Sequence, residues 1–429
     1  MVLTNVLLVC YICVTVFCTC GVNADILDRF SHRLETDARS LTVNTAINTT
    51  RYVRNIASPA ISIIEQFGYP AETHEVQTED GYLLTLHRIP YGKITPSKYQ
   101  KGRPVAILHH GILGSSDTWL LRSPDKDLAF ILADNGYDVW ISNVRGNVYS
   151  RKHISLDPDK DKQFWNFSFH EIGYYDLPAT IDYVLNVTNQ KSLFYICHSM
   201  GCTVFFILCS TRPEYNSKIR LMHGLAPAVY IVHKPSPLMK LIISNTPSLV
   251  QSCKEQNIYE LFPLRKFTGR LGRALCHKTS PTQPFCLAGV FLVAGVDYQQ
   301  LNTTLLPKIF EHYPAGSSLN TFMHFYQNIV SGSFHHMDFG EADNLIHYKQ
   351  KTPPEYNLKK VSAPVSLFYG DGDYLIKKED TEMLASKLSN LVGLFKVPFP
   401  FFNHLDFLWG TDAKPLSDVL TTAWCGVKK

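Results

Sequence analysis

The sequence contains no run of basic residues and carries little net charge for its length. Its 429 residues include 41 Lys and Arg against 37 Asp and Glu, a formal charge of +4 at pH 7. This balance argues against a nucleic-acid-binding protein. Charged residues make up 18% of the chain and apolar residues 45%, which excludes general disorder and leaves enough apolar side chains for a large core.

Motifs for metal and phosphate binding are missing as well. The sequence has no HExxH and no GxxxxGK[ST], and no pair of CxxC motifs follows residue 24. Such motifs hold zinc ions or the phosphates of nucleotides. We therefore expect neither a metal nor a cofactor.

No apolar run is long enough to cross a bilayer. Residues 6–18 are apolar and uncharged but shorter than the ~20 residues that a helical span needs. Val22, Asn23 and Ala24 then form a small-residue cleavage pattern, so residues 1–24 are predicted to be a signal peptide, with a signal anchor as the alternative. A second apolar run, residues 285–296, is also too short to span and is predicted to lie in the buried core.

A signal peptide implies the secretory pathway, where asparagine sequons can be glycosylated. Sequons occur at Asn48, Asn166, Asn186 and Asn302. We expect Asn186 and Asn302 to be the best acceptors. Asn166 lies between two aromatic residues and is predicted to be too buried for modification.

Strand and helix patterns alternate through most of the remaining chain. Residues 25–55 are polar and are interpreted as a leader or a pro-segment. Beyond them, the pattern predicts an α/β fold with a mostly parallel sheet and helices on both faces, interrupted by an insertion over residues 230–357. The core would then comprise residues 56–229 and 358–429. Strands are predicted over 105–108, 139–141, 194–196, 219–225, 365–369 and 394–397; helices are predicted over 127–135, 177–185 with Asp176 as its cap, and 201–210.

The most informative segment runs from Cys197 to Gly201, between a predicted strand and a predicted helix. This is the setting of a nucleophile elbow, a sharp turn that exposes the hydroxyl of a serine, here Ser199. The backbone N–H of Met200 would then point toward the reacting oxygen. The usual pattern is Gly-x-Ser-x-Gly, and here Cys197 replaces the first glycine.

A serine nucleophile needs a base, and the base needs an acid that orients it. In this fold the chain order is serine, acid, histidine, which indicates Asp373 as the acid and His404 as the base. Asp371 is the rival acid. His109 and His198 are poor candidates for the base. The turn at His110-Gly111-Ile112 would supply the second oxyanion donor through the N–H of Ile112.

With these residues in place, the sequence strongly resembles the acid lipase family, the gastric and lysosomal acid lipases and their insect relatives. The resemblance covers residues 59–421. It is carried by the oxyanion turn and by a string of further motifs in family order. These are Thr78-Glu-Asp-Gly-Tyr-Leu-Leu84, Gly136-Tyr-Asp-Val-Trp140, Arg145-Gly-Asn147, Tyr175-Asp-Leu-Pro-Ala179, Pro314-Ala-Gly316 and Asn403-His-Leu-Asp-Phe407.

The resemblance implies an α/β-hydrolase fold, Ser199, Asp373 and His404 as the catalytic triad, and Ile112 and Met200 as the oxyanion hole. It also implies that residues 230–357 form a cap and lid. Cys276 and Cys286 are similar to the cap disulfide of the family, with Cys253 as the competitor for either partner. Cys202 and Cys209 are expected to pack inside as small apolar groups.

The resemblance also implies a function. We expect a secreted serine hydrolase that cleaves carboxylic esters of neutral lipids, such as triacylglycerol, at a lipid–water interface. The alternative location is the lysosomal lumen. Two rival functions remain: another hydrolase of the same fold, for example a peptidase, and a catalytically silent lipid-binding relative, since Cys197 could crowd the elbow. The oligomeric state is not indicated.

Overall fold

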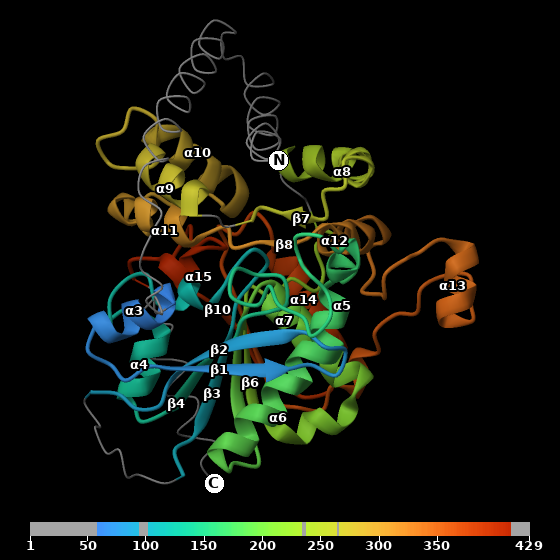
Figure 1. The fold of residues 1–429 in the computed structure, drawn as a ribbon, viewed down its shortest axis with the longest axis horizontal. Helices are drawn as coiled ribbons and strands as arrows, with labels where there is room; N and C mark the ends of the chain where they lie inside the picture. The colour runs from blue at the N-terminus through green and yellow to red at the C-terminus, as the bar shows by residue number, and fades with distance from the viewer. Residues whose placement is uncertain (1–57, 94–101, 234–236, 264–265, 413–429) are drawn as a thin grey trace, which may run out of the picture. The chain divides into compact units, whose positions relative to one another are not determined.

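An eight-stranded sheet runs through the protein in the order β1-β2-β4-β3-β5-β6-β9-β10 (Figure 1). The computed structural model describes residues 58–93, 102–233, 237–263 and 266–412. All neighbouring strands are parallel except that β2 is antiparallel to both β1 and β4. The strands are β1 (Glu72–Gln77), β2 (Leu83–Ile89), β3 (Val105–His109), β4 (Asp138–Ile141), β5 (Leu193–His198), β6 (Ile219–Leu225), β9 (Val365–Tyr369) and β10 (Leu391–Lys396).

Helices cover both faces of the sheet. Successive residues of each strand point to opposite faces, so each buried strand contributes side chains to two apolar cores. Val105 and Ile107 of β3 pack into one apolar core, and Ala106 and Leu108 pack into the other. The first core contains residues of α6 (Leu177–Thr188), α7 (Met200–Thr211) and α14 (Lys378–Lys387). The second contains residues of α3 (Pro59–Gln66), α4 (Leu128–Asp134) and α15 (Asp406–Trp409). The predicted mostly parallel sheet with helices on both faces is therefore confirmed.

The predicted role of Asp176 as a helix cap is wrong. Asp176 has helical backbone angles, because α5 (Phe169–Glu171) and the π-helical turn η3 (Ile172–Asp176) run directly into α6. Its carboxylate instead accepts hydrogen bonds from the backbone N–H and the guanidinium of Arg145, at 2.9 and 2.7 Å. The guanidinium is buried, and Asp80 binds its other side. A buried charge requires such partners, which is why Asp176 is not free to cap the helix.

Residues 230–357, which we call the cap, are inserted between β6 and β9. Most of its helices lie at one end of the sheet, and the last one stands out to the side (Figure 1). A two-stranded sheet, β7 (Glu260–Leu261) and β8 (Ser317–Ser318), pairs within it. Most of the cap is helical: α8 (Pro237–Glu255), α9 (Lys266–Leu275), α10 (Gln283–Ala294), α11 (Leu306–His312), α12 (Leu319–Ser331) and α13 (Glu341–Tyr348). Short 3-10 turns complete the chain: η1 (Ser116–Trp119), η2 (Lys162–Trp165), η4 (Pro213–Lys218), η5 (Thr303–Leu305) and η6 (Leu358–Lys360).

The apolar run at residues 285–296 does not lie in the core as predicted. It forms most of α10, in which only Phe291 and Ala294 are buried, whereas Phe285 is 49% and Val293 43% exposed. The helix is apolar on every side, so its position at the outside of the cap leaves part of that surface in solvent. Within the described ranges, no helix combines the length and the apolarity that crossing a bilayer would require.

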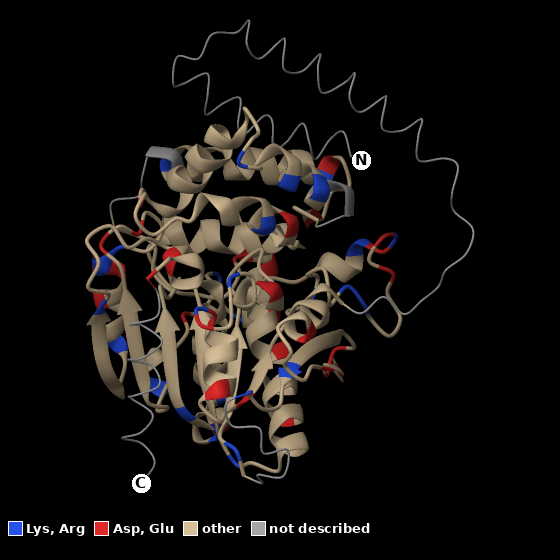
Figure 2. Ribbon diagram, turned by 90° about the vertical axis from the view of Figure 1, so that its left-hand side faces the viewer, with Lys and Arg blue, Asp and Glu red and all other residues tan. Residues whose placement is uncertain are grey.

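The distribution of charged residues along the chain agrees with the balanced charge of the sequence. Lys and Arg are interspersed with Asp and Glu along the ribbon, and no region of one sign dominates the view (Figure 2).

The sequon residues Asn166, Asn186 and Asn302 are all exposed, so the prediction that Asn166 is buried is wrong. Its neighbours Trp165 and Phe167 turn inward, which directs the asparagine outward. Asn48 and the predicted signal peptide and leader lie outside the described residues.

Candidate active site

The predicted site residues gather at the carboxyl edge of the parallel strands. Ser199 follows β5, Asp373 follows β9, His404 follows β10, and Ile112 belongs to the turn after β3. Open α/β sheets bind their ligands at this edge. The cap begins after β6, the strand between those that lead to Ser199 and Asp373, so it is inserted at the same edge.

Ser199 has a strained backbone at the start of α7. Its φ of 53° and ψ of −120° are rare for a residue with a side chain. The turn is held by Ser199 N–H, which donates to the Leu225 carbonyl at 3.0 Å. Gly201 is required here, since a Cβ atom would lie 2.7 Å from the carbonyl oxygens of both His109 and His110. A strained serine between a strand and a helix has the conformation of a nucleophile elbow.

Cys197 and Cys202 are joined by a disulfide that spans Ser199. The expectation that Cys202 packs as a free apolar group is therefore wrong, whereas Cys209 is free and buried as predicted. The sharp turn reverses the chain, which brings the two Cα atoms to 5.1 Å, a normal separation for a disulfide. The side chain of Cys197 thus points away from the turn into the core instead of crowding it.

Asp373 and His404 meet directly. Nδ1 of His404 donates to Oδ2 of Asp373 at 2.8 Å, and both residues are buried. The other carboxylate oxygen, Oδ1, accepts the backbone N–H groups of Leu375 and Ile376 at 2.8 and 2.9 Å, which fixes the orientation of the carboxylate. The described residues contain no hydrogen bond between the Ser199 hydroxyl and His404. Such a bond is often long in the absence of substrate and shortens in the reactive complex.

Asp371, the rival acid, points elsewhere. Its carboxylate is partly exposed and forms an ion pair with Lys396 on β10. Gly372 separates the two acids in a short turn that begins at Gly370, and both glycines are needed. A Cβ on Gly370 would lie 2.1 Å from the Phe402 carbonyl oxygen, and one on Gly372 would lie 2.0 Å from that of Phe401. This close approach brings the turn that carries Asp373 against the segment that leads to His404.

The turn after β3 packs against the serine. A Cβ on Gly111 would lie 3.0 Å from the Cβ of Ser199, so a side chain here would have to displace its neighbours. His110 braces the turn: its Nδ1–H donates to the Gly111 carbonyl at 2.7 Å, and its Nε2 accepts from Val144 N–H at 3.3 Å. Burial lowers the pKa of His110 to about 4, which keeps this ring neutral.

His198 has a role that the sequence did not suggest. Its Nε2–H donates to the main-chain carbonyl of His404 at 2.9 Å, and the two rings lie 4.7 Å apart. Burial lowers the pKa of His198 well below its usual value, so the ring stays neutral beside His404. His198 therefore holds the backbone of His404 and is not itself placed as a base. The only sequence signal was its position next to the serine.

The turn that carries His404 is closed by its own side chains. Oδ1 of Asn403 accepts the N–H groups of Leu405 and Asp406 at 2.9 and 3.2 Å, and Oδ2 of Asp406 accepts Asn403 N–H at 2.7 Å. Burial raises the pKa of Asp406 to about 8. The turn is thus rigid and contains a carboxyl group that is protonated at acidic pH.

The cap contains the predicted disulfide residues, and it also has a surface hollow. Cys276 and Cys286 are bonded to each other, and Cys253 is free and buried.

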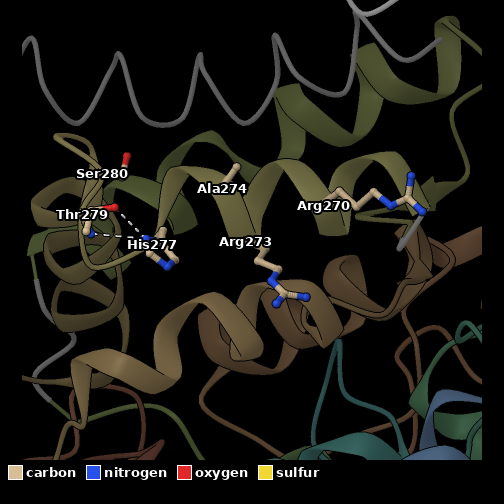
Figure 3. A pocket seen from close by; sticks show the side chains of 6 residues that line it. All are labelled: Arg270, Arg273, Ala274, His277, Thr279 and Ser280. Carbon is tan, nitrogen blue, oxygen red and sulfur yellow. Dashed lines mark hydrogen bonds between the residues drawn. The ribbon is translucent and has the colours of Figure 1, made fainter. Parts of the chain in front are cut away.

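Figure 3 shows the hollow in the surface of the cap, of about 490 Å³, beside α9; none of the predicted triad residues lines it. It is lined by Arg270, Arg273, Ala274, His277, Thr279 and Ser280. In the part of the chain that is described, no three His, Cys, Asp or Glu residues are grouped to hold a metal.

A mostly parallel sheet with a serine elbow and an aspartate–histidine pair at its carboxyl edge defines an α/β hydrolase. Comparison with known proteins agrees: residues 104–411 match the family described as alpha/beta hydrolase fold, and residues 60–123 match the partial alpha/beta-hydrolase lipase region. An esterase from Exiguobacterium antarcticum has a similar fold, with a TM-score of 0.50 and 12% identity over 83% of this chain and 100% of the esterase.

Relatives of higher sequence identity show which family of α/β hydrolases the chain resembles most. Lipase 3 of Drosophila melanogaster is 44% identical over 354 residues, which cover 82% of this chain and 88% of that protein. Gastric triacylglycerol lipase of Bos taurus is 39% identical over 352 residues, 82% of this chain and 87% of that protein. Human lipase member K is 38% identical over 354 residues, 82% and 86% of the two chains. The chain belongs to the acid lipase family and is a lipase-type carboxylic ester hydrolase.

Proposed function

We propose that this lipase hydrolyses esters of neutral lipids through Ser199, Asp373 and His404. The observation that carries the proposal is the buried 2.8 Å hydrogen bond from His404 to Asp373, on the loops next to the strained Ser199. Strain at a serine elbow persists only where the surrounding structure enforces it. Here the disulfide and the backbone contacts of Gly201 do so.

The proposed reaction is acyl transfer. Oγ of Ser199 attacks the ester carbonyl while Nε2 of His404 removes its proton, and Asp373 keeps the ring in the required tautomer. The N–H groups of Ile112 and Met200 stabilise the oxyanion, a contribution typically worth about 10²–10³ in rate for each donor. The alcohol then leaves with the proton from His404. Water attacks the acyl-enzyme in the same way and releases the fatty acid and free Ser199.

The names of the relatives support a lipid ester as substrate, and a triacylglycerol is the specific proposal. We propose that the protein is secreted after removal of residues 1–24 and acts at a lipid–water interface, with the cap as its lid. The lysosomal lumen is the alternative destination. Localisation of a tagged full-length chain, together with its N-terminal sequence, separates these two destinations and tests the cleavage.

The triad is tested with Ser199→Ala and His404→Ala, each assayed on a triacylglycerol emulsion and on a soluble short-chain ester. A fluorophosphonate probe reports labelling of the nucleophile. Ser210→Ala is the matched control, because Ser210 is a buried serine on α7, the helix that begins directly after Ser199. We expect both triad variants to fold and to lose hydrolysis, and Ser199→Ala to lose labelling, while the control keeps both. Full activity in either triad variant would refute the assignment.

The two rival functions predict different results. A peptidase would cleave amide substrates in preference to esters. A silent lipid-binding protein would show neither hydrolysis nor labelling in its natural form, and Cys197→Gly would gain both. The disulfide argues against this second rival, since it takes the Cys197 side chain away from the space next to Ser199.

A further inference from the structure

The C-terminal end of α10 in the cap lies between the two loops that carry the acid and the base. The carbonyl oxygen of Ala294 accepts two hydrogen bonds, from Tyr374 N–H at 3.1 Å and from His404 N–H at 3.3 Å. Tyr374 directly follows Asp373. One carbonyl group of the cap is therefore bonded to the main chain of the base and to the main chain next to the acid.

Gly295 extends this contact. Its carbonyl accepts a hydrogen bond from Nδ2 of Asn403 at 3.0 Å. Its φ of +116° is a conformation that residues with side chains rarely adopt, and a Cβ atom would lie 2.0 Å from the carbonyl oxygen of Gly372. A side chain at this position would therefore push the end of α10 away from the turn that holds Asp373.

The remainder of α10 is weakly anchored by comparison. Besides Ala294, only Phe291 is buried in the helix, and Leu292 and Val293, immediately before Ala294, are 38% and 43% exposed. The carbonyl group of His404 is meanwhile bonded to His198. The peptide groups of His404 thus lie between the serine elbow, through His198, and the cap, through Ala294.

We propose that Ala294 and Gly295 form a positioning element of the active site, which sets the geometry of the Asp373–His404 pair according to how α10 is seated. This inference rests on the proposed function, since it assumes that these two residues are the acid and the base. It adds that the cap is part of the catalytic support and not only a cover. Misplacement of a reacting group by about 1 Å costs on the order of 10²-fold in rate.

The test is Gly295→Ala, with Gly289→Ala as the matched control. Gly289 lies on the same helix, and a Cβ there meets no atom within 4 Å. With a soluble short-chain ester, we expect Gly295→Ala to reduce kcat by about tenfold to a hundredfold with little change in KM, because binding is not the step affected. Its pH–rate profile should shift as well, whereas the control should match wild type in all three quantities.

A second readout does not depend on activity. Hydrogen exchange at the amides of Tyr374 and His404 should become faster in Gly295→Ala and remain unchanged in Gly289→Ala. If Gly295→Ala fails to fold, Asn403→Asp replaces it, because aspartate keeps the acceptor for Leu405 and Asp406 but loses the donor to the Gly295 carbonyl. The same two amides should then exchange faster.

Wild-type kcat and wild-type exchange in Gly295→Ala would overturn the proposal, as would unchanged exchange in Asn403→Asp when that variant carries the test. Equal loss of kcat in Gly289→Ala would also overturn it, because the effect would then be general to α10. Failure of the proposed function is a separate outcome, recognised by full hydrolysis in Ser199→Ala, and the exchange result remains interpretable in that case.

Discussion

The disulfide between Cys197 and Cys202 encloses Ser199 in a loop of six residues, with each sulfur on the core side of the elbow. In the chain-entropy view, a loop of this size contributes about 2 kcal/mol to the free energy of unfolding. In the usual elbow, a glycine at the position of Cys197 fits the sharp turn because it has no side chain. Here the disulfide helps to hold the turn instead.

We expect Cys197→Gly to lower the thermal midpoint by several °C and to change turnover modestly. The double variant Cys197→Gly/Cys202→Ser serves as the control without a leftover thiol. Peptide mapping of unreduced protein should yield the 197–202 crosslink. Alkylation in denaturant without reductant should label Cys209 and Cys253 but not Cys202; a labelled Cys202 would contradict the bond.

The choice between the two acids gives the next prediction. Asp373→Asn should reduce kcat by about 10⁴, because an amide favours the wrong tautomer of His404. Asp371→Asn should change kcat very little, since it removes only a surface ion pair with Lys396, of the kind worth about 0–1 kcal/mol. Steady-state kinetics with a soluble ester measures both values. The opposite ranking would transfer the role to Asp371.

The raised pKa of Asp406 predicts how stability depends on pH. Burial raises this pKa to about 8 in the folded protein, against about 4 for an unfolded chain. Between these values the folded protein holds a proton that the unfolded chain releases, so the contribution of Asp406 to stability falls as pH rises from about 4 to 8.

Asp406→Asn removes this titration. Its thermal midpoint should therefore improve relative to wild type, by several °C, as pH rises through that window. Calorimetry at a series of pH values measures the difference, and Asp371→Asn, an exposed carboxylate, is the control. A constant difference between wild type and Asp406→Asn across the window would show that Asp406 does not titrate there.

Asn166, Asn186 and Asn302 are exposed in the described part of the chain. On the secretory route that we propose, all three should therefore accept glycans. Replacing each in turn by glutamine should lower the intact mass of the protein by one glycan. Enzymatic deglycosylation should abolish these differences. An unchanged mass in the Asn166→Gln protein would mean that this site is not used despite its exposure.

The sequence predicted the buried strands well and the contacts between distant segments poorly. The strands at 219–225 and 365–369 were predicted to the residue, although Arg220, His223 and Ser366 interrupt their apolar residues. β1 and β2 were both missed. The edge strand β1 has only one apolar residue, Val76, so its sequence lacks an alternating apolar pattern. The placement of α10 was wrong because apolar composition does not specify a partner, and the bonds from Ala294 join residues that lie far apart in the chain.

The triad residues could be nominated because their chain order is fixed by the order of the strands that carry them. The disulfide at the elbow could not, because it depends on how sharply the chain reverses at Ser199. The role of His198 was also hidden, since its partner is a main-chain carbonyl about two hundred positions away, and any residue type can supply such an acceptor.

The cap begins after β6 and ends before β9, and these two strands are neighbours in the sheet. They pair from Met222 with Val365 to Leu225 with Phe368. An exchange of caps between related lipases would therefore leave the strand register of the host intact. The transplant would nevertheless replace the residues that bond to Tyr374 and His404. A chimera designed to transfer substrate preference should thus inherit its turnover rate from the donor cap as well, unless the Ala294–Gly295 junction is kept from the host.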